Sequence, residues 1–381
     1  MTPALFDTNT YTNKSNGDAQ QTALAFRNTT TNDVLHVKVV AHNATNRTTL
    51  SQPQATGTLR HDWRHHTPLS HFAKLIHSHQ TDCSLSTATY YIDNDYGIGS
   101  HISLWSQGIC NAMQLNRRLR TVNPHWLWLD QTLCDAQVAT RSPWLCYFPQ
   151  AECQCGNSYE ELAPVNVSDP RDKKRHQCTL LKEGNSDTLH AFRAASTEVL
   201  FQTVSEVVIA EAQRQIGLLF NGSTPPDDLI TVHIRWGDKF WEMDLAPIAE
   251  YVEAVSYLLR QQGKKDNSTA NIYLATEDPK VVHEFSKGIP PGWNVFYDRT
   301  VVELKDFRPN KGNRASHMTK NTKGRAGLVA MGSLLVAMEA KWFVLTTASN
   351  WSRVMDHLRT QIINPRCNNC THMVDLRPGI W

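Results

Sequence analysis

The segment 233–242 combines several side chains that could act together on a phosphorylated substrate. His233 and Arg235 lie two residues apart, so they project from the same face of a strand. Arginine suits a phosphate because its planar guanidinium donates parallel hydrogen bonds to two oxygens. Asp238, Lys239 and Glu242 follow directly, and a carboxylate there could take a proton from an attacking hydroxyl. The alternative is a surface cluster of ion pairs without a function.

Three more polar segments come where a predicted strand ends or a helix begins. Thr276–Asp278 follows an apolar strand and contributes Asp278. Ser349 and Asn350 follow another strand and begin a helix, whose free N–H groups can bind an anion. A glycine turn leads into a helix near residue 100 and contains Gly97, Gly99 and Ser100. A plain helix N-cap and a simple turn are the alternatives for the last two segments.

The second half of the sequence alternates strand and helix patterns that would position these groups. Apolar runs predict strands at 229–235, 271–276, 294–297 and 342–347. Helices are predicted at 246–261, from Pro279 onward, at 326–340 and at 350–363. The alternation predicts a doubly wound parallel sheet, and ligands bind beyond the carboxyl ends of such strands. The polar segments are therefore expected to meet at one site.

The first half gives a weaker pattern of the same kind. Strands are predicted at 89–92 and 126–129, with helices at 102–119 and 188–219. We expect three regions: a polar stem or irregular segment at 1–60, an α/β domain at 61–221, and a Rossmann-type domain at 222–381. A chain of 381 residues is long enough for two domains of ordinary size.

Metal ligands are sparse in the sequence. Asp93 and Asp95 form the DxD pattern that holds a metal in some glycosyltransferases, but it stands before the glycine turn and outside the other polar segments. We interpret it as a turn or cap and expect no metal. Cys367 and Cys370, with His372 nearby, could bind structural zinc, but no second ligand pair stands at suitable spacing. A local disulfide is the favoured interpretation.

Composition and modification motifs indicate the compartment. The formal net charge is only +2, so we expect no nucleic-acid partner. The nine cysteines, together with N-x-S/T sequons that crowd into the first 50 residues, favour an oxidising and glycosylating lumen, with the Golgi before the endoplasmic reticulum. No apolar run of 18 residues occurs, so membrane contact is expected only through an anchor outside this sequence.

The motifs resemble those of a known superfamily. His233-Ile-Arg235-x-x-Asp238-Lys239 is similar to the His-x-Arg-Arg-x-Asp-Lys signature of α1,6-fucosyltransferases, and more distantly to protein O-fucosyltransferases and Nod-factor fucosyltransferases. The segment 273–278 resembles the family's Tyr-Leu-Ala-Thr-Asp-Asp, and the segments 97–100 and 328–353 resemble its glycine turn and its last helix, strand and Ser-Ser-Gln. The resemblance covers about 222–355 well, and earlier residues thinly.

The resemblance implies a GT-B-like fold, with two Rossmann-type domains around a cleft. It implies inverting transfer of fucose from GDP-fucose to a glycan or glycoprotein, with no metal and no other cofactor. Arg235 would bind the diphosphate, His233 the nucleotide, and Ser349 and Asn350 the phosphates. We expect Glu242 to act as the base, with Lys239 and Asp238 tuning it. Arg325 is a further candidate for the leaving diphosphate.

The sequence departs from the family pattern at several positions. Trp236 replaces the family's second arginine, and the catalytic glutamate matches Glu242 only with a shift of one residue. Ser333 stands where the family has the acidic residue that reads guanine, and Leu345 and Ser352 replace a cysteine pair. Two alternatives stay open: a transferase for another nucleotide-sugar, and a non-catalytic relative that binds a glycan or nucleotide.

Overall fold

The computed structural model describes residues 56–123, 125–152, 155, 165–166, 186–237, 239–265, 268–304 and 319–379. Its larger sheet is wholly parallel, with the strand order β6-β5-β4-β7-β8. The strands are β4 (Leu229–His233), β5 (Ala270–Ala275), β6 (Trp293–Tyr297), β7 (Trp342–Leu345) and β8 (His372–Asp375). The connecting helices are α6 (Ile248–Gln261), α7 (Pro279–Gly288), α8 (Arg299–Glu303), α10 (Arg325–Ala337) and α11 (Asn350–Leu358). The short helical turns between them are η3 (Lys239–Trp241), η4 (Lys320–Thr322), η5 (Arg359–Ile363) and η6 (Asn364–Arg366).

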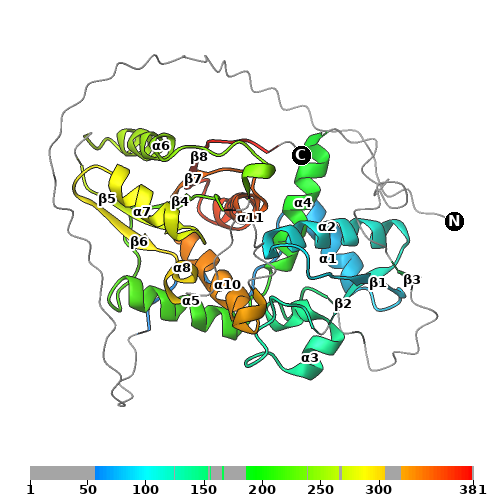
Figure 1. Ribbon diagram of the computed structural model, residues 1–381. Helices are drawn as coiled ribbons and strands as arrows, with labels where there is room; N and C mark the ends of the chain where they lie inside the picture. The colour runs from blue at the N-terminus through cyan, green and yellow to red at the C-terminus, as the bar shows by residue number, and fades with distance from the viewer. Residues whose placement is uncertain are drawn as a thin grey trace, which may run out of the picture. The chain divides into compact units, whose positions relative to one another are not determined.

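The smaller sheet is also parallel and has the order β2-β1-β3. Its strands are β1 (Thr87–Tyr91), β2 (Arg118–Val122) and β3 (Val165–Asn166). The helices of this half are α1 (His71–Thr81), α2 (Ile98–Gln114), α3 (Ala136–Arg141), η1 (Pro143–Cys146), α4 (Ser186–Leu200) and α5 (Glu206–Leu219). Two parallel sheets flanked by helices confirm the predicted α/β, GT-B-like architecture (Figure 1).

Side chains of the central strand β4 pack on both faces of the larger sheet. Ile230 and Val232 of β4 pack with buried residues of α6 and α7. Leu229 belongs to the other hydrophobic cluster, and Thr231 donates to the carbonyl of Ala337 in α10 at 2.7 Å. Because successive strand residues point to opposite faces, a strand buried on both faces is apolar throughout. Figure 1 shows α6 and α5 on opposite sides of this sheet.

The predicted strand at 126–129 is wrong. Trp126, Trp128 and Leu129 are buried, but they lie in turns, and the strand of this half is instead β2. Their backbone groups bind outside any sheet: the carbonyl of Trp128 accepts from the Tyr147 hydroxyl at 2.7 Å. The turn also packs against the start of α10, where a Cβ on Gly327 would lie 1.8 Å from the carbonyl oxygen of Trp128. The apolar run therefore serves packing between segments.

The predicted helix 188–219 is two helices, α4 and α5. The residues between them give their backbone groups to other segments: Val204 N–H donates to Trp63 O at 2.9 Å, and Ser205 N–H donates to Tyr147 O at 2.9 Å. Ser205 then takes the N-cap position of α5. The second of these helices packs closely on α10. The domain boundary near residue 222 stays a prediction.

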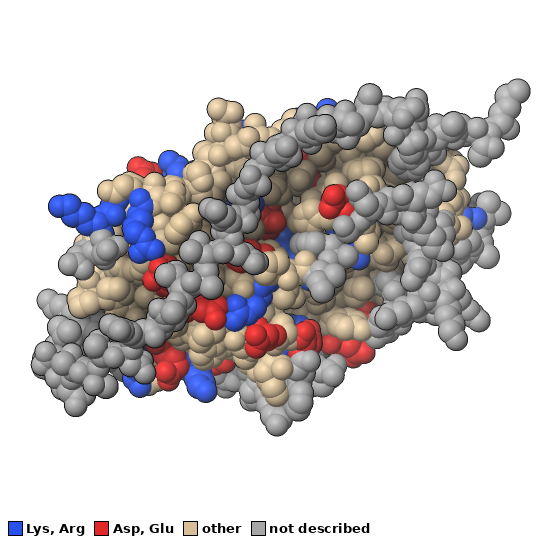
Figure 2. Space-filling model, turned by 90° about the horizontal axis from the view of Figure 1, so that it is seen from above, with Lys and Arg blue, Asp and Glu red and all other residues tan. Residues whose placement is uncertain are grey.

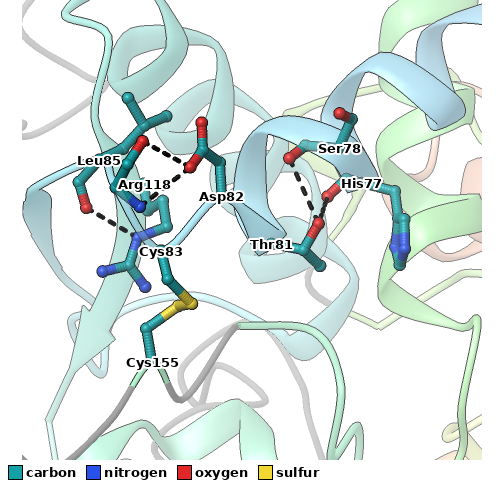
Figure 3. The surroundings of a disulfide bond; sticks show 9 residues. His77, Ser78, Thr81, Asp82, Cys83, Leu85, Arg118 and Cys155 are labelled. Atoms are coloured by element: carbon teal, nitrogen blue, oxygen red, sulfur yellow. Dashed lines mark hydrogen bonds between the residues drawn. A yellow bond between two sulfur atoms is a disulfide. The ribbon is translucent and has the colours of Figure 1, made fainter.

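Disulfides fasten the first half and the end of the chain. Cys83–Cys155 joins the loop after α1 to the segment beyond Glu152, and beside it Arg118 Nε donates to Leu85 O at 3.0 Å (Figure 3). Cys134 pairs with Cys146, and Cys110 is also disulfide-bonded. Cys367 pairs with Cys370, which confirms the disulfide interpretation of that motif. These bonds agree with an oxidising compartment.

Charged residues of both signs are mixed on the face of the molecule that Figure 2 shows. On the face in Figure 2, Lys and Arg lie among Asp and Glu over the central part, and several basic residues gather towards one end. None of the described helices has the length and apolar character that crossing a bilayer requires.

Candidate active site

One cavity, about 520 Å³ in volume, lies where the carboxyl ends of the larger sheet meet the start of α2. This volume falls in the range of ordinary small-molecule sites. The larger sheet supplies the residues that follow β4, β5, β6 and β7, which are His233, Arg235, Thr276, Glu277, Asp298 and Ser349. The other half supplies Asp95, Tyr96, Gly97, Ile98, Gly99, Ser100, Ser103, Leu104 and Trp128. The structure therefore brings together most of the polar segments identified in the sequence, as expected for ligand sites at the carboxyl ends of parallel strands.

His233 is a buried, neutral group at the end of β4. Burial lowers the pKa of the imidazole to about 3, and the positive charge of Arg235 contributes to the shift. Its Nδ1 lies 2.6 Å from the hydroxyl of Ser352 in α11. The ring lines the cavity, so it presents a polar edge there without a charge.

Arg235 is the cation at the centre of the cavity wall. Its side chain is only 11% exposed, and its Nη1 lies 2.5 Å from Glu277 Oε1 and 2.9 Å from the carbonyl of Trp236. The pairing with Glu277 balances the charge inside the cavity, where an unpaired guanidinium would be costly. A bound diphosphate would bring a second anion to the same guanidinium, which has five N–H donors.

Two helices begin at this cavity. Gly97 is the N-cap of α2 and Ser349 is the N-cap of α11, and neither makes a side-chain capping bond among the described residues. Asn350 joins the two helix ends, since its Nδ2 donates to Ser100 Oγ at 2.9 Å. Open N–H groups and the positive ends of two helix dipoles favour an anionic ligand.

Close packing and a hydrogen bond fix these helix ends. A Cβ on Gly99 would lie 3.1 Å from both the backbone nitrogen and the ring of Trp351, so glycine permits the approach. Arg353 Nη1 donates to Asn350 Oδ1 at 3.1 Å, which leaves the amide nitrogen of Asn350 for Ser100. The two halves of the cavity wall are therefore held in register.

Lys239, the first residue of the turn η3, forms an ion pair with Glu242, which directly follows the turn. Both line the cavity, but the lysine side chain is 17% exposed and the glutamate side chain is 62% exposed. Glu242 therefore sits at the open side, where an acceptor from solvent could reach it. Asp238, predicted with them, lies outside the described residues.

Asp298 is a carboxylate in the cavity wall that the sequence analysis missed. It follows β6 and accepts from Thr300 N–H at 2.7 Å, and Ser333 Oγ lies 2.8 Å from the same oxygen. Burial raises the pKa of Asp298 to about 6, although the hydrogen bonds from Thr300 and Ser333 oppose the shift. The group is therefore a carboxylate only above about pH 6.

Three predicted binding residues do not line the cavity. Asp278 caps α7, because Pro279 opens that helix and Lys280 N–H binds the carboxylate at 2.9 Å. Glu277 faces the cavity instead. Ser333 lies behind Asp298, and Arg325 lies beside the carboxylates of Glu211 and Asp130, at 3.6 Å and 4.0 Å.

The DxD pattern lies nearer the site than expected. Asp95 lines the cavity, whereas Asp93 Oδ1 accepts from Asp95 N–H at 3.0 Å and lies 3.6 Å from His101 Nε2. The glycine turn that follows the pattern carries Asp95 into the wall. Among the described residues, no group of three His, Cys, Asp or Glu stands close enough together to hold a metal ion.

Fold and cavity together define an α/β protein with two parallel sheets and a cavity lined by residues of both halves. No family model and no curated protein matches the sequence. Solved structures are similar at low identity. A NodZ alpha-1,6-fucosyltransferase soaked with GDP-fucose is 13% identical with a TM-score of 0.38, and the match covers 72% of this chain and 92% of that one.

Two more solved structures are similar to this chain. The fucosyltransferase NodZ from Bradyrhizobium is 12% identical, with a TM-score of 0.38 and coverage of 71% of this chain and 93% of that one. POFUT1 in complex with GDP is 11% identical, with a TM-score of 0.36 and coverage of 77% and 99%. These neighbours are glycosyltransferases. The likeness is distant, and the proposed function rests on the residues that line the cavity.

Proposed function

We propose that this chain is an inverting, metal-independent glycosyltransferase that transfers fucose from GDP-fucose to a glycan or glycoprotein. The observation that carries the proposal is the convergence of Arg235 and the open ends of α2 and α11 on one cavity. Such a cavity fits a diphosphate with a bulky group at each end. The same feature supports a more general proposal, that the protein binds a nucleotide-sugar.

The reaction is a single displacement. An acceptor hydroxyl attacks the anomeric carbon of fucose, the new C–O bond forms, and the bond from that carbon to the β-phosphate oxygen breaks. The bonding electrons stay on the phosphate, so GDP leaves with increased negative charge. Arg235 and the N–H groups at the starts of α2 and α11 stabilise that charge, and they do so most in the transition state.

Glu242 is the proposed base. It lies at the open side of the cavity beside Lys239, and a carboxylate there can accept the proton of an incoming hydroxyl. A base at the mouth suits an acceptor that arrives from solvent after the donor has bound.

Asp298 is proposed to recognise the nucleobase of the donor. Guanine offers two adjacent N–H donors, and a carboxylate accepts from both, whereas cytosine and uracil do not offer that pair. Ser333 occupies the position of the family's acidic residue but holds Asp298 by a hydrogen bond. The carboxylate would then come from the loop after β6 instead of from α10.

The disulfides and the sequons support a site of action in the secretory lumen, and we propose the Golgi. Metal independence is part of the proposal, because Arg235 and two helix ends can offset the leaving charge without a cation.

Incubating purified protein with GDP-fucose, UDP-N-acetylglucosamine or CMP-sialic acid, and measuring the released nucleotide, tests the proposal. We expect slow release of GDP from GDP-fucose alone and faster release with a glycoprotein acceptor mixture. The Glu242→Gln variant should lose the acceptor-dependent rate and still bind GDP. Nucleotide binding without release would favour a non-catalytic relative, and release from another donor would correct the sugar or the base.

A further inference from the structure

Ser352 is a buried residue of α11 that contacts the cavity only through another side chain. It is fully buried, and its hydroxyl touches two groups. The backbone N–H of Thr346 donates to Ser352 Oγ at 3.1 Å, and His233 Nδ1 lies 2.6 Å from the same oxygen. Ser352 therefore connects the loop after β7 to the histidine at the end of β4.

The proton count at Ser352 selects one arrangement of the histidine ring. A backbone N–H can only donate, so Ser352 Oγ accepts from Thr346. The hydroxyl has one proton of its own to give, and His233 Nδ1 is its acceptor among the contacts in the described residues. If Nδ1 carried a proton instead, two donors would face one oxygen, and the hydroxyl proton would be buried without an acceptor among the described residues, which is unfavourable.

The remaining ring nitrogen then carries the proton. A neutral imidazole has one N–H and one bare nitrogen, so a bare Nδ1 leaves the hydrogen on Nε2. The ring lines the cavity, and Ser352 holds its Nδ1 edge. The arrangement gives the cavity an uncharged hydrogen-bond donor next to the cationic Arg235.

We infer that Ser352 is a positioning residue that holds His233 as its Nε2–H tautomer, so that the histidine donates a hydrogen bond to an oxygen of the nucleotide-sugar. The identity of the ligand rests on the proposed function, whereas the tautomer does not. A donor suits a ligand whose phosphate, ribose and sugar oxygens are mostly acceptors. The other tautomer would point a lone pair at those oxygens and repel them.

The ring nitrogens of the free protein provide the first test. ¹⁵N-labelled histidine in the whole chain distinguishes bare from protonated nitrogen by chemical shift, and loss of the signal in His233→Phe assigns it. We expect a bare Nδ1 and a protonated Nε2. Ser352→Ala should mix or reverse the two, and Ser352→Thr, which keeps a hydroxyl, should restore them.

Nucleotide affinity provides the second test. Ser352→Ala should weaken GDP binding roughly three- to tenfold, the value of one hydrogen bond, and Ser352→Thr should recover part of it. Ser196→Ala is the matched control, since it removes a buried helical hydroxyl that donates to Phe192 O at 2.9 Å, away from the cavity. It should leave both measurements unchanged.

A wild-type spectrum with the proton on Nδ1 overturns the inference, even if no Ser352 variant folds. An unchanged ring signal in Ser352→Ala does so too. The expected tautomer without binding of any nucleotide removes the proposed ligand, and with it the proposed function, but leaves the role of Ser352 towards His233 intact.

Discussion

Replacing Arg235 by lysine keeps the charge and removes the planar fork. The arginine lies two residues beyond β4, a strand whose five residues are all buried, and its side chain is 11% exposed, so its head group has little freedom. Its Nη1 already contacts Glu277 and the carbonyl of Trp236. A single ammonium cannot keep these contacts and also bind two oxygens of a diphosphate. We expect turnover to fall roughly 10²–10³-fold, or about 3–4 kcal/mol, as for the loss of one charge-stabilising donor.

The assay measures kcat and KM for GDP-fucose together with the melting temperature of each variant. Because the phosphate charge rises in the transition state, kcat should fall more than KM rises. Arg299→Lys is the matched control: Arg299 is a partly buried arginine paired with Glu303 at 2.8 Å, outside the cavity wall. If Arg235→Lys transfers sugar normally and merely melts lower, Arg235 is a structural partner of Glu277 and our reasoning about it is wrong.

Three more results are expected. Glu242→Gln should lower transfer about 10²–10⁴-fold with an unchanged Kd for GDP, measured by calorimetry; a variant with normal turnover would move the base to another group. Excess EDTA should leave transfer unchanged, whereas loss of activity that Mn²⁺ restores would make Asp95 a metal ligand. Burial raises the pKa of Glu339 from 4.5 to about 7, so the folded state binds this proton more tightly than the unfolded state and stability falls as pH rises from about 4.5 past 7. Glu339→Gln should remove that part of the decline, which is about 3 kcal/mol at most; urea denaturation curves that change with pH in parallel for the two proteins would contradict the assignment.

The helices and strands of the second half could be predicted because the spacing of apolar residues in each segment matches the burial of that segment. The strands β4, β5 and β6 are apolar and the helices between them are amphipathic, and the observed bounds differ from the predicted ones by a few residues. Asp278 before Pro279 is a helix start that sequence rules describe well. Local pattern was sufficient because the central strands β4 and β5 are buried on almost their whole length.

The first half was harder to predict because its segments form hydrogen bonds and packing contacts with residues far away in sequence. The run 126–129 has the composition of a strand, yet Tyr147 and the glycines of α10 determine its shape. The break between α4 and α5 depends on bonds from 204 and 205 to Trp63 and Tyr147. A reader of the sequence could have noticed Ser205 before Glu206, a common helix start, but not these partners.

The candidate site also contains some residues that the sequence could predict and others that it could not. His233 and the Ser349–Asn350 helix start follow from the strand-end rule, and both line the cavity. Asp298 directly follows the predicted strand 294–297, so the same rule points to it although the sequence analysis missed it. Ser352 could not be found so, because its role depends on His233, 119 residues away in sequence. Arg325 was chosen for a charge that suits a diphosphate, whereas in the structure it lies outside the cavity wall, next to the carboxylates of Glu211 and Asp130.

Nucleotide selectivity tests the central claim most directly. Purified protein is titrated with GDP, UDP, CDP and ADP, and the melting temperature is followed, with Asp298→Asn alongside. The account predicts that GDP alone stabilises strongly, by about 2.7 kcal/mol at a hundred times its Kd, and that Asp298→Asn loses the preference for guanine. A protein that no nucleoside diphosphate stabilises, or one that UDP stabilises more than GDP, would contradict it.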